Sequence, residues 1–323
     1  MKKIFFAVLA LAAMASCSKD EVIEVNREQI GFGEAFVENS TRATDNTYKS
    51  NKDVQSFKVW GTVKGTHTGS EEVVIFPGTL VSRPDGLTGY NPATAWICDN
   101  VQYWVPNAKY NFTAVVDGEY DLATKKIAYT VADQKDLLLA TATASVNNNG
   151  VVDGTNANGL VAFTFNHLLS KAYFTFKTTD AFATNAYTYE ISNIKFANAY
   201  TSGNYTVGGD WEATDKAALS FGDNTVTLAP SKTTAVETTS EYARVFIPQQ
   251  DIQVLFTITM KYGGKAVSVK EYNYTVFKET DAVKKSVAGH QYNFVVNVAE
   301  NNTIQFTVNS DPAWTDGGNV TVQ

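Results

Sequence analysis

Cysteine is nearly absent from this sequence of 323 residues, which contains only Cys17 and Cys98. Because Cys17 is expected to be modified, as argued below, Cys98 has no partner and no intramolecular disulfide can form. The fold must then be held together by core packing. Histidine is also scarce, since His67, His167 and His290 do not lie at metal-ligand spacing from one another or from Cys98. We therefore expect no metal site and no cofactor.

Strong or clustered charge is missing as well. The net charge is −7 and charged residues make up 18% of the chain. Without a basic face, the chain does not fit the electrostatic pattern of a nucleic-acid-binding protein. His167, Ser170 and Lys171 lie within one short segment, but no glycine elbow presents the serine. A phosphate-binding glycine loop is absent too, so we expect no enzyme.

Long hydrophobic runs are limited to the beginning of the chain. Two lysines precede an apolar run over residues 4–15, which is too short for a normal membrane span and typical of a secretory signal, residues 1–16. Cys17 directly follows small residues, which predicts a lipobox with Cys17 as the acylated residue; the alternative is an ordinary signal with an incidental cysteine. Residues 17–28 would form the lipidated tether. Their acidic run over residues 18–21 resembles the surface-export signal of Bacteroidales lipoproteins, although any lipoprotein needs a solvated tether.

Strand-forming patterns are abundant. Apolar residues alternate over residues 161–165 and 254–260, and over residues 57–63, where Trp60 falls on the polar face of a half-buried strand. Such runs separated by Gly/Asn turns predict an all-β fold of β-sandwich type. A mature chain of about 300 residues suits two such domains better than one.

The Asn/Gly-rich stretch of residues 145–159 is the expected domain boundary. It divides the chain into an N-terminal β-sandwich domain, residues 29–159, and a C-terminal one, residues 160–323. The alternative is that this stretch is a long hairpin within one domain.

The stretch of residues 29–44 is the centre of our functional hypothesis. Ile30, Phe32 and Phe36 fall on one face of an extended chain, which predicts a first strand within residues 29–42. Arg42 follows among small polar residues, in an exposed segment of the kind that proteases cut. A strand followed by a cleavable linker is a removable piece.

A second candidate site is the polar, Gly-rich segment of residues 198–211, which we expect to be a loop. Tyr200, Tyr205 and Trp211 in this segment could stack on sugar rings. This leaves a monomeric surface glycan-binding lipoprotein as the alternative function. The other interpretation of these aromatic residues is that they close a sheet edge.

Motifs in a fixed order along nearly the whole chain resemble the fimbrillin (Mfa-like) family of Bacteroidales type V pili. The lipidated start is one of them. The others are 30–32 (IGF), 41–43 (TRA), 104–106 (WVP), 112–114 (FTA), 136–140 (DLLLA), 165–171 (FNHLLSK), 246–249 (FIPQ), 289–292 (GHQY) and 312–314 (PAW).

The resemblance implies two transthyretin-like β-sandwich domains in tandem. It also implies a lipoprotein precursor at the outer membrane and cell surface, held there by palmitate and other acyl chains on Cys17. A trypsin-like, Arg-specific protease would cut between Arg42 and Ala43. The first strand would then leave, and the C-terminal strand of a neighbouring pilus subunit would fill the groove by donor-strand exchange. The expected function is that of a fimbrial structural subunit supporting cell adhesion; stalk, tip and anchor roles stay open.

The last part of the chain supplies the expected donor strand, near residues 302–322. Ile304, Phe306 and Val308 lie on one face and mirror the pattern of the first strand. A substituting strand must offer the same period-2 apolar face, because a slip of one residue would turn every side chain to the wrong side. The alternative is that residues 302–308 close the sheet of their own domain.

Overall fold

The structure, a computed structural model, describes residues 28–37, 54–84, 95–179, 181–183, 186–239, 243–300, 303–311 and 319–321. Nearly all regular structure in these ranges is β-strand, and the one helical element among them is the 3-10 turn η1 (Val131–Asp133). The expected all-β class is therefore confirmed. The finer expectation of two transthyretin-like sandwiches in tandem stays a prediction.

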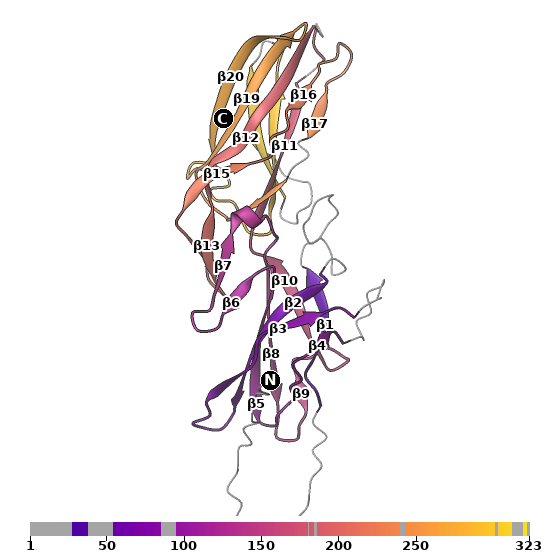
Figure 1. Ribbon diagram of the computed structural model, residues 1–323, viewed down its shortest axis with the longest axis vertical. Helices are drawn as coiled ribbons and strands as arrows, with labels where there is room; N and C mark the ends of the chain where they lie inside the picture. Colours follow the sequence, from indigo (N-terminus) through magenta and orange to yellow (C-terminus); the bar gives the residue numbers. More distant parts are fainter. Residues whose placement is uncertain are drawn as a thin grey trace, which may run out of the picture.

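The N-terminal half forms one sheet, seen in the lower part of Figure 1, with the strand order β1-β10-β8-β5-β2-β3-β4 and with β9 beside β8. Its strands are β1 (Gly31–Val37), β2 (Ser56–Gly65), β3 (Glu72–Ser82), β4 (Ile97–Cys98), β5 (Ala108–Val116), β8 (Leu138–Val146), β9 (Val152–Asp153) and β10 (Leu160–His167). In β5, Tyr110 and Phe112 are buried while the residues between and before them are exposed, which is the period-2 pattern of a strand with one face on a core.

The C-terminal half contains two sheets. One has the order β17-β11-β21-β22-β23 with β18 beside β11, and the other has the order β15-β12-β19-β20 with β16 beside β12. The first comprises β11 (Ser170–Thr178), β17 (Glu237–Thr239), β18 (Arg244–Phe246), β21 (Gln291–Val298), β22 (Ile304–Asp311) and β23 (Asn319–Thr321). The second comprises β12 (Tyr187–Tyr200), β15 (Lys216–Ser220), β16 (Val226–Leu228), β19 (Ile252–Tyr262) and β20 (Lys265–Val276).

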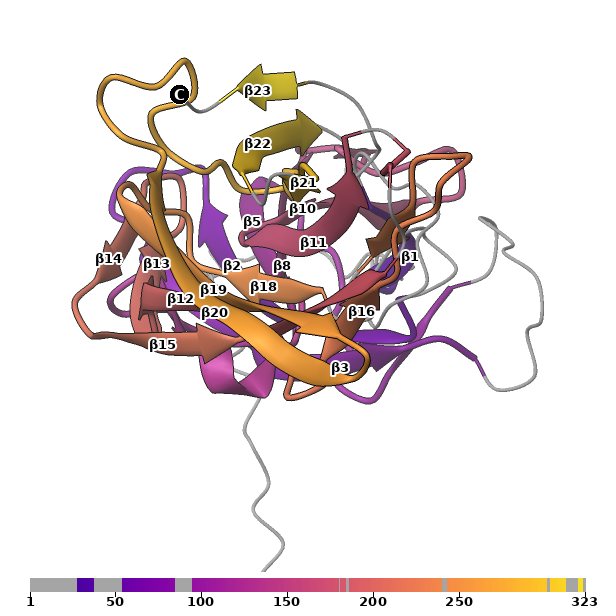
Figure 2. The same cartoon turned by 90° about the horizontal axis from the view of Figure 1, so that it is seen from above.

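These two sheets form separate layers, with β11, β21 and β22 on one side and β12, β19 and β20 on the other (Figure 2). Both layers contribute buried side chains to one hydrophobic cluster, here called the C-terminal cluster. Phe174 and Phe294 enter it from the first layer, and Phe196 and Phe256 enter it from the second. The core of this half therefore lies between two facing sheets.

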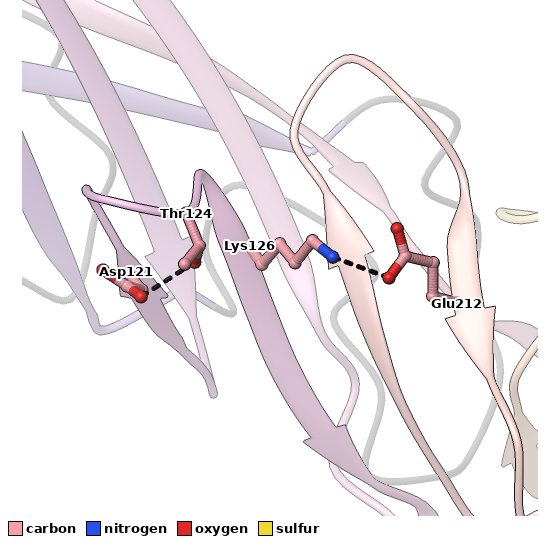
Figure 3. A network of polar contacts seen from close by, with 4 residues as sticks. All are labelled: Asp121, Thr124, Lys126 and Glu212. Carbon is pink, nitrogen blue, oxygen red and sulfur yellow. Dashed lines mark hydrogen bonds and ion pairs between the residues drawn. The ribbon is translucent and has the colours of Figure 1, made fainter.

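A smaller sheet joins the two halves. Its order is β14-β13-β7-β6, so β6 (Glu119–Asp121) and β7 (Lys126–Thr130) of the first half pair with β13 (Ser202–Thr206) and β14 (Trp211–Ala213) of the second. In Figure 3, Lys126 Nζ of β7 and Glu212 Oε2 of β14 form an ion pair of 2.6 Å across β13. In the β6–β7 turn beside it, the Thr124 hydroxyl donates to Asp121 Oδ2 at 2.8 Å.

A junction cluster lies where the chain crosses between the halves. Leu168 and Leu169 connect β10 to β11, and they pack with buried residues of both halves, including Trp60, Tyr129 and Ile247. Trp60 is only 6% exposed, so β2 is buried on both faces at this point rather than half-buried as its sequence predicts.

The N-terminal half extends past residue 159. β10 contributes Val161, Phe163 and Phe165 to the hydrophobic cluster of this half, here called the N-terminal cluster. The Asn/Gly-rich stretch makes turns within the same half, since β8 and β9 pair in antiparallel fashion around it. The structure therefore shows the hairpin alternative rather than a division after residue 159, while the domain limits otherwise stay a prediction.

Candidate functional site

β1 is the element around which the candidate site is built. It pairs in parallel with β10, in a register that runs from Gly31 opposite Leu160 to Val37 opposite Phe165. Its other edge contacts residues 96–104. Backbone hydrogen bonds there run from Ile30 N–H to Gln102 O (2.8 Å), from Trp96 N–H to Phe32 O (2.8 Å) and from Trp104 N–H to Glu28 O (3.0 Å). β1 is therefore inserted between two walls and closes the gap between β10 and the β4 region.

The side chains of β1, and of Ile30 directly before it, enter the N-terminal cluster with an irregular spacing. Ile30 and Phe32 are 2% and 0% exposed, and Ala35 and Val37 are also buried. The register with β10 shifts between Gly33 and Ala35, which is a β-bulge. Because the bulge adds one residue, the inward face changes from even to odd positions.

Phe36 is therefore not on the inward face, contrary to the sequence-based expectation. It is 38% exposed. The two inward residues after the bulge, Ala35 and Val37, were missed because simple alternation does not reveal a bulge.

Phe32 lies among the rings of the N-terminal cluster. The ring-centroid distances are 5.2 Å to Phe76, 5.9 Å to Phe112, 6.0 Å to Phe163 and 6.5 Å to Phe57. All but the pair with Phe163, which is stacked, are edge-to-face, and both arrangements are favourable for aromatic pairs. Phe32 is thus the anchor of β1 in this core.

The expected donor strand, β22, is packed in its own half. It pairs with β21 from Ile304 opposite Val298 to Asp311 opposite Gln291, without a break in register. Phe306 and Val308 are buried in the C-terminal cluster, and Ile304 is half-buried beside it. β23 pairs with the other edge of β22. In this chain the strand closes its own sheet, and donation to a neighbour stays a prediction.

The aromatic segment expected to be a sugar-binding loop is mostly strand. Tyr200 ends β12, Tyr205 lies in β13, and Trp211 begins β14 directly opposite Tyr205. All are half-buried and pack against the junction cluster. The Trp211 indole N–H donates to the Leu168 carbonyl at 2.9 Å. These contacts are those of aromatic residues that close a sheet edge, and glycan binding stays an untested prediction.

A buried polar pair lies beside the junction cluster and was not expected from the sequence. His167 Nδ1 is 2.9 Å from Asp136 Oδ2, and both side chains are almost fully buried. The two residues come from separate motifs quoted above, so only the fold brings them together. Ser170, three residues after His167 in the sequence, donates its hydroxyl to the Val287 carbonyl at 2.8 Å.

Tyr129 lies close to this pair. Its hydroxyl donates to the Lys135 carbonyl at 2.8 Å. Burial, and then the nearby carboxylates of Asp136 and Asp133, raise the pKa of Tyr129 well above the usual value for tyrosine.

Several expected features lie outside the described residues. These are Cys17, Arg42, Ala43 and the motif at 312–314. Within the described ranges, no group of three or more His, Cys, Asp or Glu side chains is placed to hold a metal ion. In the same ranges, none of the helical structure has the length and apolar character needed to cross a membrane.

The protein is thus all-β, and its first described strand fills a slot between β10 and residues 96–104. A family model described as fimbrillin-like matches residues 41–312, and the chain belongs to this family. The family is one of fimbrial structural proteins, so membership supports a role as a pilus subunit at the cell surface, in association with other fimbrial subunits.

Solved structures with a similar overall course include a fimbrial protein from Bacteroides vulgatus, with 15% identity and a TM-score of 0.49 over 90% of this chain and 100% of that one. The fimbrial anchor protein Mfa2 from Porphyromonas gingivalis shows 11% identity and a TM-score of 0.40 over 91% and 100% of the two chains. No curated protein sequence matches this chain.

Proposed function

We propose that this chain is a fimbrial subunit that reaches the outer membrane as a lipoprotein, is cut after Arg42, loses β1 and polymerises by donor-strand exchange, supporting cell adhesion. The observation that carries the proposal is the position of β1, which is hydrogen-bonded along both edges and anchored by Phe32 in the N-terminal cluster. Withdrawing such a strand leaves a groove with backbone donors and acceptors on both walls. A strand from another subunit can bind there by β-augmentation.

The energetics favour refilling the groove. Burial of a large apolar side chain contributes roughly 1.5–3 kcal/mol, so Ile30, Phe32 and Val37 together contribute on the order of 5–9 kcal/mol. The whole stability of a domain is about 5–15 kcal/mol. A subunit without β1 is therefore poorly stable alone, and a replacement strand restores much of what was lost.

The position of Arg42 suits the cut. It is the only basic residue between Arg27 and Lys49. Arg27 precedes β1, so a cut there would leave the groove filled. A cut after Arg42 separates both β1 and the lipidated Cys17 from the rest of the chain. One event would thus release the subunit from its anchor and open the groove.

The donor strand in this scheme is β22. Its strict alternation presents Ile304, Phe306 and Val308 on one face, as a strand entering an apolar groove requires. Donation requires β22 to leave its place beside β21. When one subunit donates a C-terminal strand and accepts an N-terminal replacement, the contact repeats head to tail and produces a filament rather than a closed dimer.

Limited proteolysis tests the central steps. Purified chain without its signal is treated with trypsin at low dose, and the products are run on a gel without boiling. We expect a ladder of polymers whose subunits begin at Ala43 by mass spectrometry. The Arg42→Gln variant should block both results, whereas the matched control Lys49→Gln should block neither. Assembled subunits that retain residues 29–44 would contradict the proposal.

The lipid step has a separate test. We expect Cys17→Ala to release the protein from the membrane fraction and to prevent incorporation of labelled palmitate, because the thiol is the acyl acceptor. The matched control Cys98→Ala should keep both properties. Labelled fatty acid on the Cys17→Ala protein would show that this residue is not the anchor.

A further inference from the structure

The outward side of β1 is closely packed, like its inward side. Gly31 and Gly33 lie opposite Leu160 and Ala162 of β10, and the Leu160 side chain lies over both glycines. A Cβ atom added to Gly31 would lie 2.6 Å from Leu160 Cδ2. A Cβ added to Gly33 would lie 2.7 Å from Leu160 Cδ1 and 3.2 Å from Leu160 Cβ. These distances are too short for ordinary carbon–carbon contact, which begins near 3.5 Å.

The backbone does not explain these glycines. Neither Gly31 nor Gly33 has a positive φ, in contrast to turn glycines such as Gly150 and Gly263. Glycine weakens a strand interior and often marks a close approach by another group. The approaching group here is Leu160, which is only 9% exposed.

A rotamer change of Leu160 can relieve the two methyl contacts, because both methyl carbons are attached to Cγ and move together about χ1. It cannot relieve the contact of 3.2 Å between Leu160 Cβ and a Cβ at position 33. The Leu160 Cβ is fixed by the β10 backbone, and its short distance to position 33 is the same in every rotamer. Position 33 is therefore the stricter of the two.

We propose that Leu160 selects which strand can occupy the β1 groove. This inference rests on the proposed function, in which another strand replaces β1. The selected strand carries large apolar residues at the inward positions of Ile30 and Phe32 and glycine at the two outward positions beside Phe32. The partner is thus a subunit whose donor strand has the pattern apolar-Gly-aromatic-Gly.

The chain's own β22 does not have this pattern. If Phe306 takes the place of Phe32, its neighbours Gln305 and Thr307 take the outward positions under Leu160, whichever way the strand runs. Both bear a Cβ atom. The groove of this subunit therefore favours a different subunit as donor. β22 of a second copy is the weaker occupant that remains when, as in the purified chain, no such donor is present.

The steric part is tested in the intact, uncut chain by a double-mutant cycle. We expect Gly33→Val to lower the melting temperature, and Leu160→Ala in the same chain to recover at least half of that loss, because the two side chains compete for one space. Gly33→Ala repeats the cycle if the valine variant does not fold. The matched control is Phe36→Val, an exposed change on the same strand, which should alter the melting temperature little. Equal melting temperatures for Gly33→Val and the unchanged chain would overturn the proposal.

The selection itself is tested with labelled peptides during cleavage. The full chain is treated with trypsin in the presence of a peptide of residues 28–38, the same peptide with valine at both glycine positions, or a peptide of residues 302–310. Uptake is measured by label on unboiled gels. We expect the first peptide to be taken up about tenfold more than the other two, which is the ratio given by roughly 1.4 kcal/mol of overpacking. In the Leu160→Ala chain the difference should shrink to about threefold or less.

The outcomes separate the two proposals. Equal uptake of all three peptides by the unchanged chain would overturn selection by Leu160 and leave donor-strand exchange intact. If no peptide enters the cleaved chain, the proposed function fails, and the double-mutant cycle still decides whether Leu160 requires glycine at position 33.

Discussion

At the scale of single residues, burial decides how much a side chain contributes to stability. Phe32 and Phe36 belong to the same strand, yet Phe32 is fully buried among aromatic rings and Phe36 is largely outward. Tyr129 shows the same principle for a polar group, because burial and nearby carboxylates disfavour its ionised form. Both observations lead to mutational predictions, and a more exposed residue of the same type serves as the control in each experiment.

We predict that Phe32→Ala lowers the free energy of unfolding by about 3–5 kcal/mol, because it removes a buried ring and leaves a cavity. Phe36→Ala, on the same strand, should cost clearly less, about 1 kcal/mol, because a ring that is 38% exposed loses less burial. Urea denaturation followed by tryptophan fluorescence measures both values. Similar losses for the two variants would show that the bulge does not turn Phe36 away from the core.

The raised pKa of Tyr129 predicts a loss of stability at alkaline pH. Below about pH 10 the phenol is protonated in both states and titration changes nothing. Above that pH the unfolded chain loses the proton while the folded chain, with its raised pKa, keeps it, so the free energy of unfolding falls. We expect melting temperature to fall less steeply with pH in Tyr129→Phe than in the unchanged chain. Tyr103→Phe, at a 47% exposed position, is the control and should keep the original slope; identical slopes for all three would contradict the prediction.

At the scale of elements, β1 and β22 differ in how regularly they alternate. β1 has a bulge between Gly33 and Ala35, so the inward residues are Ile30, directly before the strand, and Phe32, then Ala35 and Val37. β22 alternates without a break against β21. A strictly alternating strand can match one of the two inward pairs of β1, and it reaches the other pair only by forming a bulge of its own.

Locking β22 in place tests whether it is the donor. Asn297 of β21 and Gln305 of β22 are directly opposite each other, at a separation that a disulfide between neighbouring strands can bridge. We predict that the pair Asn297→Cys and Gln305→Cys, once oxidised, blocks polymer formation after cleavage, because β22 cannot leave its sheet. Reducing agent should restore the ladder on unboiled gels. Each single-cysteine variant is the control. Undiminished polymers from the oxidised protein would show that β22 does not donate.

The disulfide tests donation by β22 more cleanly than a charged substitution in that strand would. Phe306 stacks on Tyr274 at a centroid distance of 4.6 Å and is 4% exposed. Replacing it with Asp would place an unpaired charge in the C-terminal cluster and unfold the donor half before any exchange.

At the scale of the whole molecule, the two halves share structure rather than only a linker. The sheet β14-β13-β7-β6 contains strands from both, and the junction cluster draws its residues from both. The buried pair of Asp136 and His167 lies at the same crossing. Shared burial of this kind couples the unfolding of one half to that of the other.

We predict that Leu169→Ala weakens this coupling. Leu169 is fully buried in the junction cluster, so its truncation should cost about 2–5 kcal/mol. By differential scanning calorimetry, the transition should move to lower temperature and broaden or divide into two as the halves begin to unfold separately. Leu80→Ala, at a 57% exposed position, is the control and should keep the original profile. An unshifted, undivided transition for Leu169→Ala would mean that the junction does not couple the halves.

The all-β class and many of the buried strand faces can be predicted from the amino-acid sequence. Period-2 alternation predicts β10 and β19 with inward residues such as Phe163 and Phe256, because a strand places successive side chains on opposite faces whatever its partners are. Ile30 and Phe32 were found in the same way. The ordered motifs pointed to the family that the family model then confirmed.

The contacts between distant segments could not be predicted from the sequence. Periodicity describes one strand and contains no information on its neighbours, so it could not show that Trp60 is covered by the junction, that β10 belongs to the N-terminal half, or that β1 lies between β10 and residues 96–104. The bulge that turns Phe36 outward depends on the register with β10. The contact of Leu160 with two glycines more than 120 residues earlier arises from the same register. Each of these features depends on distant segments packing together, and only the folded chain brings them into contact.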